Sequence, residues 1–235
     1  MAKPAAQPHI ASAYTYAELG DGRAQHAALA EECALAISYN DLNQAVMMVS
    51  PHHLEDFAVG FSFGNDLIKS IDDIYDIQLR GIGDSREACL QVSSRAFWAL
   101  KQQRRQLAGT SGCGLCGVEA VEQALPALSV LPLTPPLDGA LLAGLRVQIA
   151  QWQLKGQQHG ALHAALALDA EGRILHCRED IGRHNALDKL IGLLLRGHSA
   201  CDTLVVTSRC GSELVQKAAR FGARHLICLA SPSQL

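Results

Sequence analysis

The sequence predicts a mixed α/β protein in which a smaller α+β N-terminal lobe precedes an α/β C-terminal domain. Three observations support this: strand-like and helix-like segments alternate through the last third, a strand pair followed by an amphipathic helix occupies the first third, and 235 residues allow two modest lobes. The alternation favours a mainly parallel sheet in the last third. We expect an arm over 1–26, the lobe over 27–108 and the domain over 109–235.

The composition excludes several classes of protein. A net charge of −3 and a pI near 6.3 argue against nucleic acid or an anionic membrane surface as the main partner. Apolar stretches such as 190–195 are far shorter than the roughly 18 residues of a membrane span. Residues 1–16 also lack the apolar core of a signal peptide. We therefore expect a cytoplasmic protein that binds neither nucleic acid nor membrane.

The N-terminal part begins with an arm and a hairpin. Residues 1–26 are rich in Ala, Pro, Gln and Gly without a sustained hydrophobic period, so we expect them to be weakly ordered. Two strand-like segments then flank a turn and predict a β-hairpin: 34–39, Asn40–Asp41 and 44–49.

An amphipathic helix and two more strands complete the lobe. Ser50 and Pro51 suit an N-cap and a first-turn proline, and apolar residues then recur at helical spacing as far as Phe61, which predicts a helix that faces the hairpin. Strands are predicted over 74–79 and 88–92. The basic residues that follow are typical of a solvated helix face: Arg95, Lys101, Arg104 and Arg105.

The C-terminal domain shows the clearest pattern. After a proline-punctuated connection, we predict helices over 138–154, 185–195 and 212–221, and strands over 161–168, 173–178, 203–207 and 225–229. Asn185 suits the cap of the second of these helices, and Gly222 suits the end of the third.

Two of the eight cysteines form a close pair, Cys113 and Cys116, within the segment 110–117. The cysteines at 33, 89, 177, 201 and 228 lie singly in or beside apolar runs, as small buried thiols do. Glycines flank the pair just before a predicted helix, where backbone N–H groups and the helix dipole favour a thiolate. One of these cysteines should therefore have a pKa below the usual value of about 8.5.

Four interpretations of this pair compete. A zinc site would need further ligands, for which His159 and His163 are candidates, although a strand-like run would hold these two side chains roughly 13 Å apart. A thiol–disulfide switch, a persulfide carrier and a pair of inert buried thiols are the others. We favour sulfur transfer, because the glycine-rich flanks offer few apolar atoms for packing.

A second candidate site follows two strands. The segment 178–189 joins a strand end to a helix start and carries Arg183 and His184, and the segment 207–213 repeats this arrangement with Arg209. Loops at the carboxyl ends of strands and helix N-termini favour anions, which predicts a nucleotide or pterin phosphate ligand. The alternative is a scaffolding role, in which Arg178 and Arg183 pair with Glu179 and Asp180.

Four motifs in order resemble the formate dehydrogenase accessory sulfurtransferase FdhD family, over residues 32–235. They are Thr110-Ser-Gly-Cys-Gly-Leu-Cys-Gly117, Gly160-Ala-Leu-His163-Ala-Ala165, Arg178-Glu-Asp-Ile-Gly-Arg-His-Asn-Ala-Leu-Asp-Lys189 and Thr207-Ser-Arg-x-x-x-x-Leu-Val-Gln-Lys217. A single motif would be weak evidence, but four in the same order are highly specific.

The resemblance implies a sulfurtransferase and a cytidine-deaminase-like C-terminal domain. Cysteine desulfurase would load persulfide sulfur on Cys113, with Cys116 as its partner, and the sulfur would pass to the molybdenum bis(molybdopterin guanine dinucleotide) cofactor of formate dehydrogenase. The cofactor is a bound substrate, and no resident metal is expected. Arg183, His184, Arg209 and His163 are our candidate cofactor-binding residues. Deamination is not expected, because no Pro-Cys-x-x-Cys follows Leu125. We also expect a homodimer.

The sequence departs from the family pattern in three places. The segment 61–66 lacks the usual Glu-Gly, and Cys210 and Gly211 replace what are commonly Ala or Val and Ser. The chain also ends at Leu235, where family members continue with a helix and a Gly-Arg-rich strand, so the resemblance implies a truncated C-terminus. A non-catalytic chaperone that binds a guanine nucleotide or pterin is the alternative function.

Overall fold

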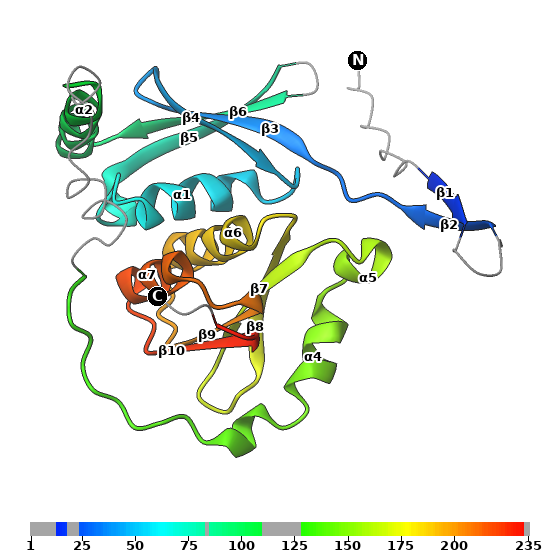
Figure 1. Ribbon diagram of the computed structural model, residues 1–235. Coiled ribbons are helices and arrows are strands. Elements are labelled where there is room, and N and C mark those ends of the chain that lie inside the picture. Colours follow the sequence, from blue (N-terminus) through cyan, green and yellow to red (C-terminus); the bar gives the residue numbers. More distant parts are fainter. Residues whose placement is uncertain (1–12, 18–23, 83–84, 110–127, 233–235) are drawn as a thin grey trace, which may run out of the picture.

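The computed structural model describes residues 13–17, 24–82, 85–109 and 128–232 (Figure 1). It confirms a mixed α/β structure, with two four-stranded sheets and one separate strand pair. The elements are β1 (Ala13–Ala17), β2 (Ala24–Ala28), β3 (Cys33–Tyr39), β4 (Leu42–Val49), α1 (Leu54–Gly64), η1 (Ile71–Asp73), β5 (Ile74–Ile82), β6 (Ser85–Val92), α2 (Ser94–Gly109), η3 (Gly139–Leu142), α4 (Leu145–Trp152), α5 (Gly156–His159), β7 (His163–Leu168), β8 (Ile174–Asp180), α6 (Arg183–Arg196), β9 (Thr203–Arg209), α7 (Ser212–Phe221) and β10 (His225–Ala230).

The first sheet has the strand order β4-β3-β6-β5 and confirms the predicted hairpin. Asn40 and Asp41 join β3 to β4 with φ angles of 46° and 64°, which suit a tight two-residue turn. β3 and β6 pair in parallel, and β5 and β6 form a second hairpin. Alternate side chains of β3 are buried towards α1, where the Tyr39 hydroxyl lies 2.6 Å from Ser62 Oγ.

Helix α1 begins later than predicted. Its N-cap is His53, which has a left-handed φ of 56° and no side-chain cap. Ser50 is not the N-cap, because its amide donates to Asp180 Oδ2 (3.0 Å) and its Oγ accepts from the Ile181 amide (3.2 Å). Long-range hydrogen bonds take the place of the local cap that the sequence suggests.

The second sheet has the order β10-β9-β7-β8, and the prediction that it is mainly parallel is wrong. Only β9 and β10 pair in parallel, while β7 is antiparallel to both β8 and β9. The physical reason is the Asp169–Gly172 turn, which makes β7 and β8 a hairpin and places β7 between two strands of opposite direction. β8, β9 and β10 run the same way, so their carboxyl ends share one edge of the sheet.

The helices of the second half differ from prediction in detail. The predicted helix over 138–154 is divided into η3 and α4, with a break at Gly144, whose φ is 73°, and the short helix α5 follows it. Helix α6 begins directly after Gly182, so Asn185 lies inside the helix and does not cap it. Helix α7 ends at Gly222 with a φ of 95°, as predicted.

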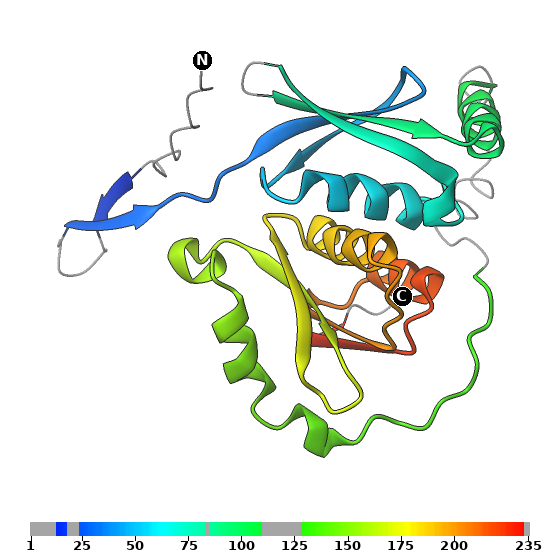
Figure 2. The same ribbon diagram turned by 180° about the vertical axis from the view of Figure 1, so that it is seen from behind.

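Helices α1 and α6 lie between the two sheets in both views (Figures 1 and 2). They approach closely through two glycines. A Cβ atom on Gly60 would lie 1.8 Å from the Asp188 carbonyl oxygen, and one on Gly192 would lie 1.8 Å from the Asp56 carbonyl oxygen. One hydrophobic cluster includes residues of both sheets and of α1, α6 and α7, while α4 packs on the other face of the second sheet.

Part of the predicted arm has regular structure. Ala13–Ala17 and Ala24–Ala28 pair as an antiparallel ladder, although we expected residues 1–26 to be weakly ordered. These strands are short and rich in alanine, so they carry little of the alternation that predicts a strand. The predicted boundary between 108 and 109 adjoins residues 110–127, which lie outside the described residues, and stays a prediction.

Candidate functional site

The topology of the second sheet brings three predicted site segments to one edge. Arg183 and His184 follow β8, Arg209 ends β9, and His163 begins the antiparallel strand β7 between them. His163 is paired in register with Asp180, the last residue of β8. The two predicted strand-to-helix loops therefore lie at one edge of the sheet, although β7 separates their strands, and the role of these residues in binding stays a prediction.

Arg183 and His184 have polar atoms that face no partner among the described residues. The Nε of Arg183 and the Nε2 of His184 are buried without a hydrogen bond. Glu213, in the first turn of α7, is the nearest opposite charge, at 3.7 Å from His184 Nε2. That separation exceeds hydrogen-bond length, so the hydrogen-bonding capacity of these two nitrogens is not used by the described residues.

The electrostatics of this edge favour an anion. Burial lowers the pKa of His184, and Arg183 lowers it further, while Glu213 opposes the shift. Burial and Arg183 likewise lower the pKa of His163, with Asp180 opposing. Arg183 thus lowers the pKa of both imidazoles. Both histidines are neutral near pH 7, and Arg183 carries the fixed positive charge.

Arg209 has no described interaction that links its side chain to Arg183, His184 or His163. Its side chain is exposed, and the position of its strand end places it at this edge. The next residue, Cys210, is half-buried at the start of the loop to α7.

A buried ion pair holds the loop that carries Arg183. Lys189 Nζ lies 2.6 Å from Asp180 Oδ2, and neither side chain is exposed. Lys189 also donates to the Ser50 carbonyl at 2.9 Å. Asp180 Oδ1 accepts from the Gly182 amide and from Asn185 Nδ2, each at 2.9 Å. Burial is the largest influence on Lys189 and lowers its pKa, while Asp180 opposes that shift.

The predicted scaffolding pairs are replaced by contacts to other elements. Arg178 binds Asp56 of α1, with 2.8 Å between Nη2 and Oδ2. Glu179 accepts from the amides of Lys155 and Gly156 at 3.1 and 2.7 Å. The segment 178–189 is therefore both scaffold and site: its acids and Arg178 fix the backbone, and Arg183 and His184 face the edge.

A second buried pair joins α6 to α7. Lys217 Nζ donates to both carboxylate oxygens of Asp188, at 2.7 and 2.9 Å. Burial raises the pKa of Asp188, and Lys217 opposes that shift. This pair explains why Asp188 and Lys217 occur in two of the four motifs, and it fixes α7 and the loop that begins with Arg209.

Cys113 and Cys116 lie outside the described residues, after the end of α2 at Gly109. The other six cysteines are buried or half-buried and form no disulfide among the described residues, in agreement with a packing role for most of them. Burial raises the pKa of Cys177 to about 12. Burial also raises the pKa of Cys228 to about 12, together with a hydrogen bond and a charge interaction with Cys210.

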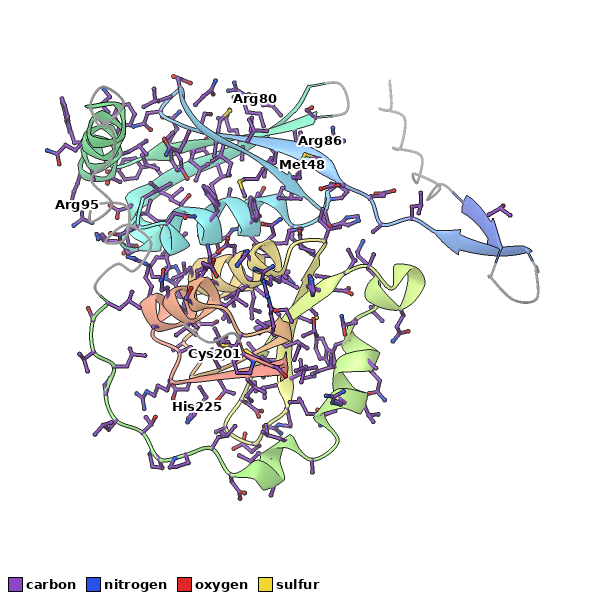
Figure 3. The ribbon with its side chains drawn as sticks, in the orientation of Figure 1. Met48, Arg80, Arg86, Arg95, Cys201 and His225 are labelled. Carbon is purple, nitrogen blue, oxygen red and sulfur yellow. The ribbon has the colours of Figure 1, made fainter. Side chains whose placement is uncertain are left out.

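Helix α2 leads to the cysteine pair and carries Arg95 and Lys101 of the predicted basic face, while the side chains of Arg104 and Arg105 lie outside the described residues. Arg95 is exposed and pairs with Asp73 at 3.0 Å. Lys101 Nζ lies 4.3 Å from the ring centre of Phe97 and 5.2 Å from that of Trp98. Figure 3 shows Arg95 at this end of the first sheet.

A cavity of about 450 Å³ lies away from this edge, between the start of α1, the β5–β6 hairpin and Arg196. Arg80 and Arg86 are among its lining residues and are labelled on the first sheet in Figure 3. Its two acids, Glu55 and Asp56, are both paired with Arg196. None of the predicted site residues Arg183, His184, Arg209 and His163 lines this cavity, so we do not assign the predicted anion site to it.

Two kinds of feature are absent from the described part of the chain. No helix there combines the length and apolar character that a membrane span requires. No group of three or more His, Cys, Asp or Glu side chains there is placed to hold a metal ion. The zinc interpretation depended on Cys113 and Cys116, which lie outside the described residues, and on His159, whose side chain is also outside them.

Sequence reasoning missed the residues that connect the two sheets. Asp56 is 3% exposed and binds both Arg178 and Arg196. Its position on the apolar stripe of α1 is a signal for a buried ion pair, because an unpaired carboxylate there would be costly. Ser50 and the glycines of the α1–α6 contact carry no comparable signal in one sequence.

Comparisons with known proteins agree with the motifs. The sequence profile of the FdhD/NarQ family matches residues 30–235. The chain is 39% identical over 217 residues to the sulfur carrier protein FdhD of Cupriavidus necator, covering 88% of this chain and 73% of the relative. A crystal structure from Desulfotalea psychrophila, assigned as a formate dehydrogenase accessory protein, has a similar fold with a TM-score of 0.70 and 24% identity, covering 96% of this chain and 85% of that one.

Proposed function

The chain belongs to the FdhD/NarQ family, and from this premise we propose that it is a sulfur carrier for the maturation of formate dehydrogenase. The observation that carries the proposal is its 39% identity to a sulfur carrier protein over most of both chains. The glycine-flanked Cys113 and Cys116 supply thiols suited to this chemistry.

The proposed first step is a thiol exchange. The Cys113 thiolate attacks the terminal sulfur of a persulfide on a cysteine desulfurase, the S–S bond of that persulfide breaks, and the desulfurase thiolate leaves. Cys113 then carries the transferred sulfur as a persulfide. If the Cys116 thiolate attacks the Cys113 sulfur, the terminal sulfur leaves as sulfide and the two cysteines form a disulfide. The two thiols lose two electrons, and the transferred sulfur gains them.

The proposed acceptor is the molybdenum bis(molybdopterin guanine dinucleotide) cofactor, bound as a substrate. Diphosphate oxygens suit the buried Arg183 Nε and the neighbouring His184 Nε2, which face no partner among the described residues. His163 and Arg209 complete the proposed site at the same sheet edge. The ion pairs of Asp180 and Asp188 keep this edge in place.

The remaining proposals concern fold relationship, assembly and location. We propose that the second sheet with its helices is cytidine-deaminase-like, that the chain forms a homodimer, and that it works in the cytoplasm with a cysteine desulfurase. Light scattering of the purified chain tests the dimer.

A maturation assay tests the function. Formate dehydrogenase activity is measured in cells that lack their own carrier and receive either this chain, Cys113→Ala or Cys89→Ala. We expect Cys113→Ala to abolish maturation and Cys89→Ala, which alters a thiol of the first sheet, to retain it. Full maturation with Cys113→Ala would reject sulfur transfer and support the alternative, a cofactor-binding chaperone.

A further inference from the structure

Ser50 directs all three of its polar groups to the segment 178–189, which carries two of the proposed cofactor-binding residues. Its amide donates to Asp180 Oδ2 at 3.0 Å, and its Oγ accepts from the Ile181 amide at 3.2 Å. Its carbonyl oxygen accepts from Lys189 Nζ at 2.9 Å. Ser50 is 4% exposed and directly follows β4, so a buried residue at the end of a strand of the first sheet supplies these three bonds.

The loop between β8 and α6 consists of two residues, Ile181 and Gly182. Asp180 Oδ1 accepts from the Gly182 amide at 2.9 Å, so the segment itself holds that amide. The Ile181 amide is held from outside the segment, by the Ser50 hydroxyl. If that hydroxyl is removed, the amide needs another acceptor, and the loop must move to find one. One of the two amides of this loop therefore depends on Ser50.

The same loop determines the direction in which Arg183 and His184 leave the backbone, because they are the first two residues of α6. The Nε of Arg183 and the Nε2 of His184 are buried and form no hydrogen bond with the described residues. Since no described hydrogen bond fixes these two atoms, the backbone ahead of them has the larger part in their placement. Contacts to phosphate oxygens are sensitive to small errors in such placement.

We propose that Ser50 is a positioning residue for the cofactor: its hydroxyl fixes the loop ahead of Arg183 and so prepares Arg183 and His184 to bind a diphosphate. In this role Ser50 need not touch the ligand, because it acts through the Ile181 amide. The inference rests on the proposed function, which supplies the diphosphate ligand. It makes cofactor binding at the edge of the second sheet depend on the end of β4.

Ser62 provides a matched control, because it is also a buried serine with a bonded hydroxyl. Its Oγ donates to the Ala58 carbonyl at 2.6 Å and lies 2.6 Å from the Tyr39 hydroxyl, so its partners belong to α1 and β3. Ser62→Ala thus removes a buried hydroxyl without removing a bond to the segment 178–189. Ser50→Thr is the conservative variant, since threonine retains the γ-oxygen that accepts from the Ile181 amide.

The test measures the binding of inorganic pyrophosphate to the full-length chain by isothermal titration calorimetry. We expect Ser50→Ala to raise the dissociation constant by about tenfold or more, and Ser50→Thr and Ser62→Ala to change it by less than about twofold. Urea unfolding of the same variants measures their stability. We expect Ser50→Ala to lose affinity even where its stability matches that of Ser62→Ala, which separates positioning from a general loss of structure.

NMR gives a second reading that does not depend on the ligand. Burial is the largest influence on His184 and lowers its pKa. Release of the loop in Ser50→Ala should expose the imidazole to water and move its titration midpoint towards the ordinary 6.5, whereas Ser62→Ala should leave the midpoint unchanged. In the unaltered chain, the Ile181 amide should exchange its hydrogen with solvent slowly, as the Gly182 amide does.

Several results would overturn the inference. Equal affinity for pyrophosphate, or an equal His184 midpoint, in Ser50→Ala and Ser62→Ala would do so. The absence of pyrophosphate binding by the unaltered chain would also do so, as would rapid exchange of its Ile181 amide, which decides the matter even if a variant fails to fold.

Sulfur loading separates this inference from the proposed function. Loading of Cys113 does not pass through the loop between β8 and α6, so Ser50→Ala should gain sulfur on Cys113 as the unaltered chain does. A chain that binds pyrophosphate in the Ser50-dependent way but gains no sulfur on Cys113 would reject the proposed function and leave the role of Ser50 in place.

Discussion

Lys189 and Asp180 form an ion pair from which water is excluded, with 2.6 Å between Nζ and Oδ2 and no exposure of either side chain. In the sequence, Asp180 precedes Arg183 and His184, and Lys189 follows them. Both residues of the pair also form hydrogen bonds with the backbone of Ser50, which follows β4. The pair therefore connects the proposed cofactor edge of the second sheet to the first sheet. Within the segment 178–189, Asp180 and Lys189 therefore have a structural role, because they hold the backbone that carries Arg183 and His184.

Removing one partner of this pair should be costly. Lys189→Met leaves the Asp180 carboxylate buried without its counter-charge, so we expect the free energy of unfolding to fall by about 3–5 kcal/mol. Urea unfolding followed by circular dichroism measures the change. Lys69→Met is the control, because Lys69 and Asp66 form an exposed pair that should contribute less than about 1 kcal/mol. Similar losses for the two variants would contradict the account.

The α1–α6 contact should not tolerate a methyl group. Gly60→Ala places a Cβ atom 1.8 Å from the Asp188 carbonyl oxygen. The helices must separate, so we expect a loss of at least about 1–3 kcal/mol from overpacking, although alanine normally favours a helix interior. Gly139→Ala is the matched control, since no atom lies within 4 Å of its added Cβ. An unchanged melting temperature for Gly60→Ala would show that the helices are not in this contact.

The convergence of Arg183 with two imidazoles predicts a pH effect. The pKa values of His163 and His184 lie below the ordinary 6.5, so NMR titrations should show midpoints below it. Because the folded state then binds protons less readily than the unfolded state, these histidines reduce stability as the pH falls below 6.5. Arg183→Gln should raise both pKa values by removing a positive neighbour, whereas Arg209→Gln removes the same charge and should leave both unchanged. Equal effects of the two variants would contradict the placement of Arg183.

The thiols should differ widely in reactivity. Cys177 and Cys228, with pKa values raised to about 12, remain protonated at pH 8 and should react slowly with iodoacetamide. Cys113 should react fastest if its glycine-rich segment favours the thiolate. Quantitative mass spectrometry of peptides after a timed alkylation gives the order. Faster labelling of Cys177 than of Cys113 would contradict the assignment.

The sequence predicts a helix, strand or turn well where neighbouring residues alone determine it. The β3–β4 hairpin follows from Asn40 and Asp41 between two strand-like runs, and α7 follows from its apolar spacing and Gly222. The antiparallel pairing of β7 with β9 could not be predicted this way, because a sheet order that inserts β7 between β8 and β9 is a tertiary feature. The starts of α1 and α6 were misjudged for a related reason: Ser50 and Asn185 make long-range hydrogen bonds that no local pattern reveals.

The sequence predicts where the candidate site residues lie along the strands and helices. It does not predict the ion pairs that hold their backbone in place. The local pattern predicted that Arg183, His184 and Arg209 follow or end strands, and the structure places those strand ends at one edge of the second sheet; their role in binding stays a prediction. The partners of Asp180, Asp188 and Arg178 are distant in the chain, and one sequence gives no measure of such distances. Asp56 alone carried a signal, as a charged residue on an apolar helix face.

One measurement tests the central claim most directly. The reduced chain is incubated with a cysteine desulfurase and cysteine, and the peptide that contains residues 110–117 is examined by mass spectrometry. We predict the added mass of one sulfur atom on Cys113, absent from Cys113→Ala and retained in Cys89→Ala. A chain that gains no sulfur on this peptide while the desulfurase is active would contradict the account.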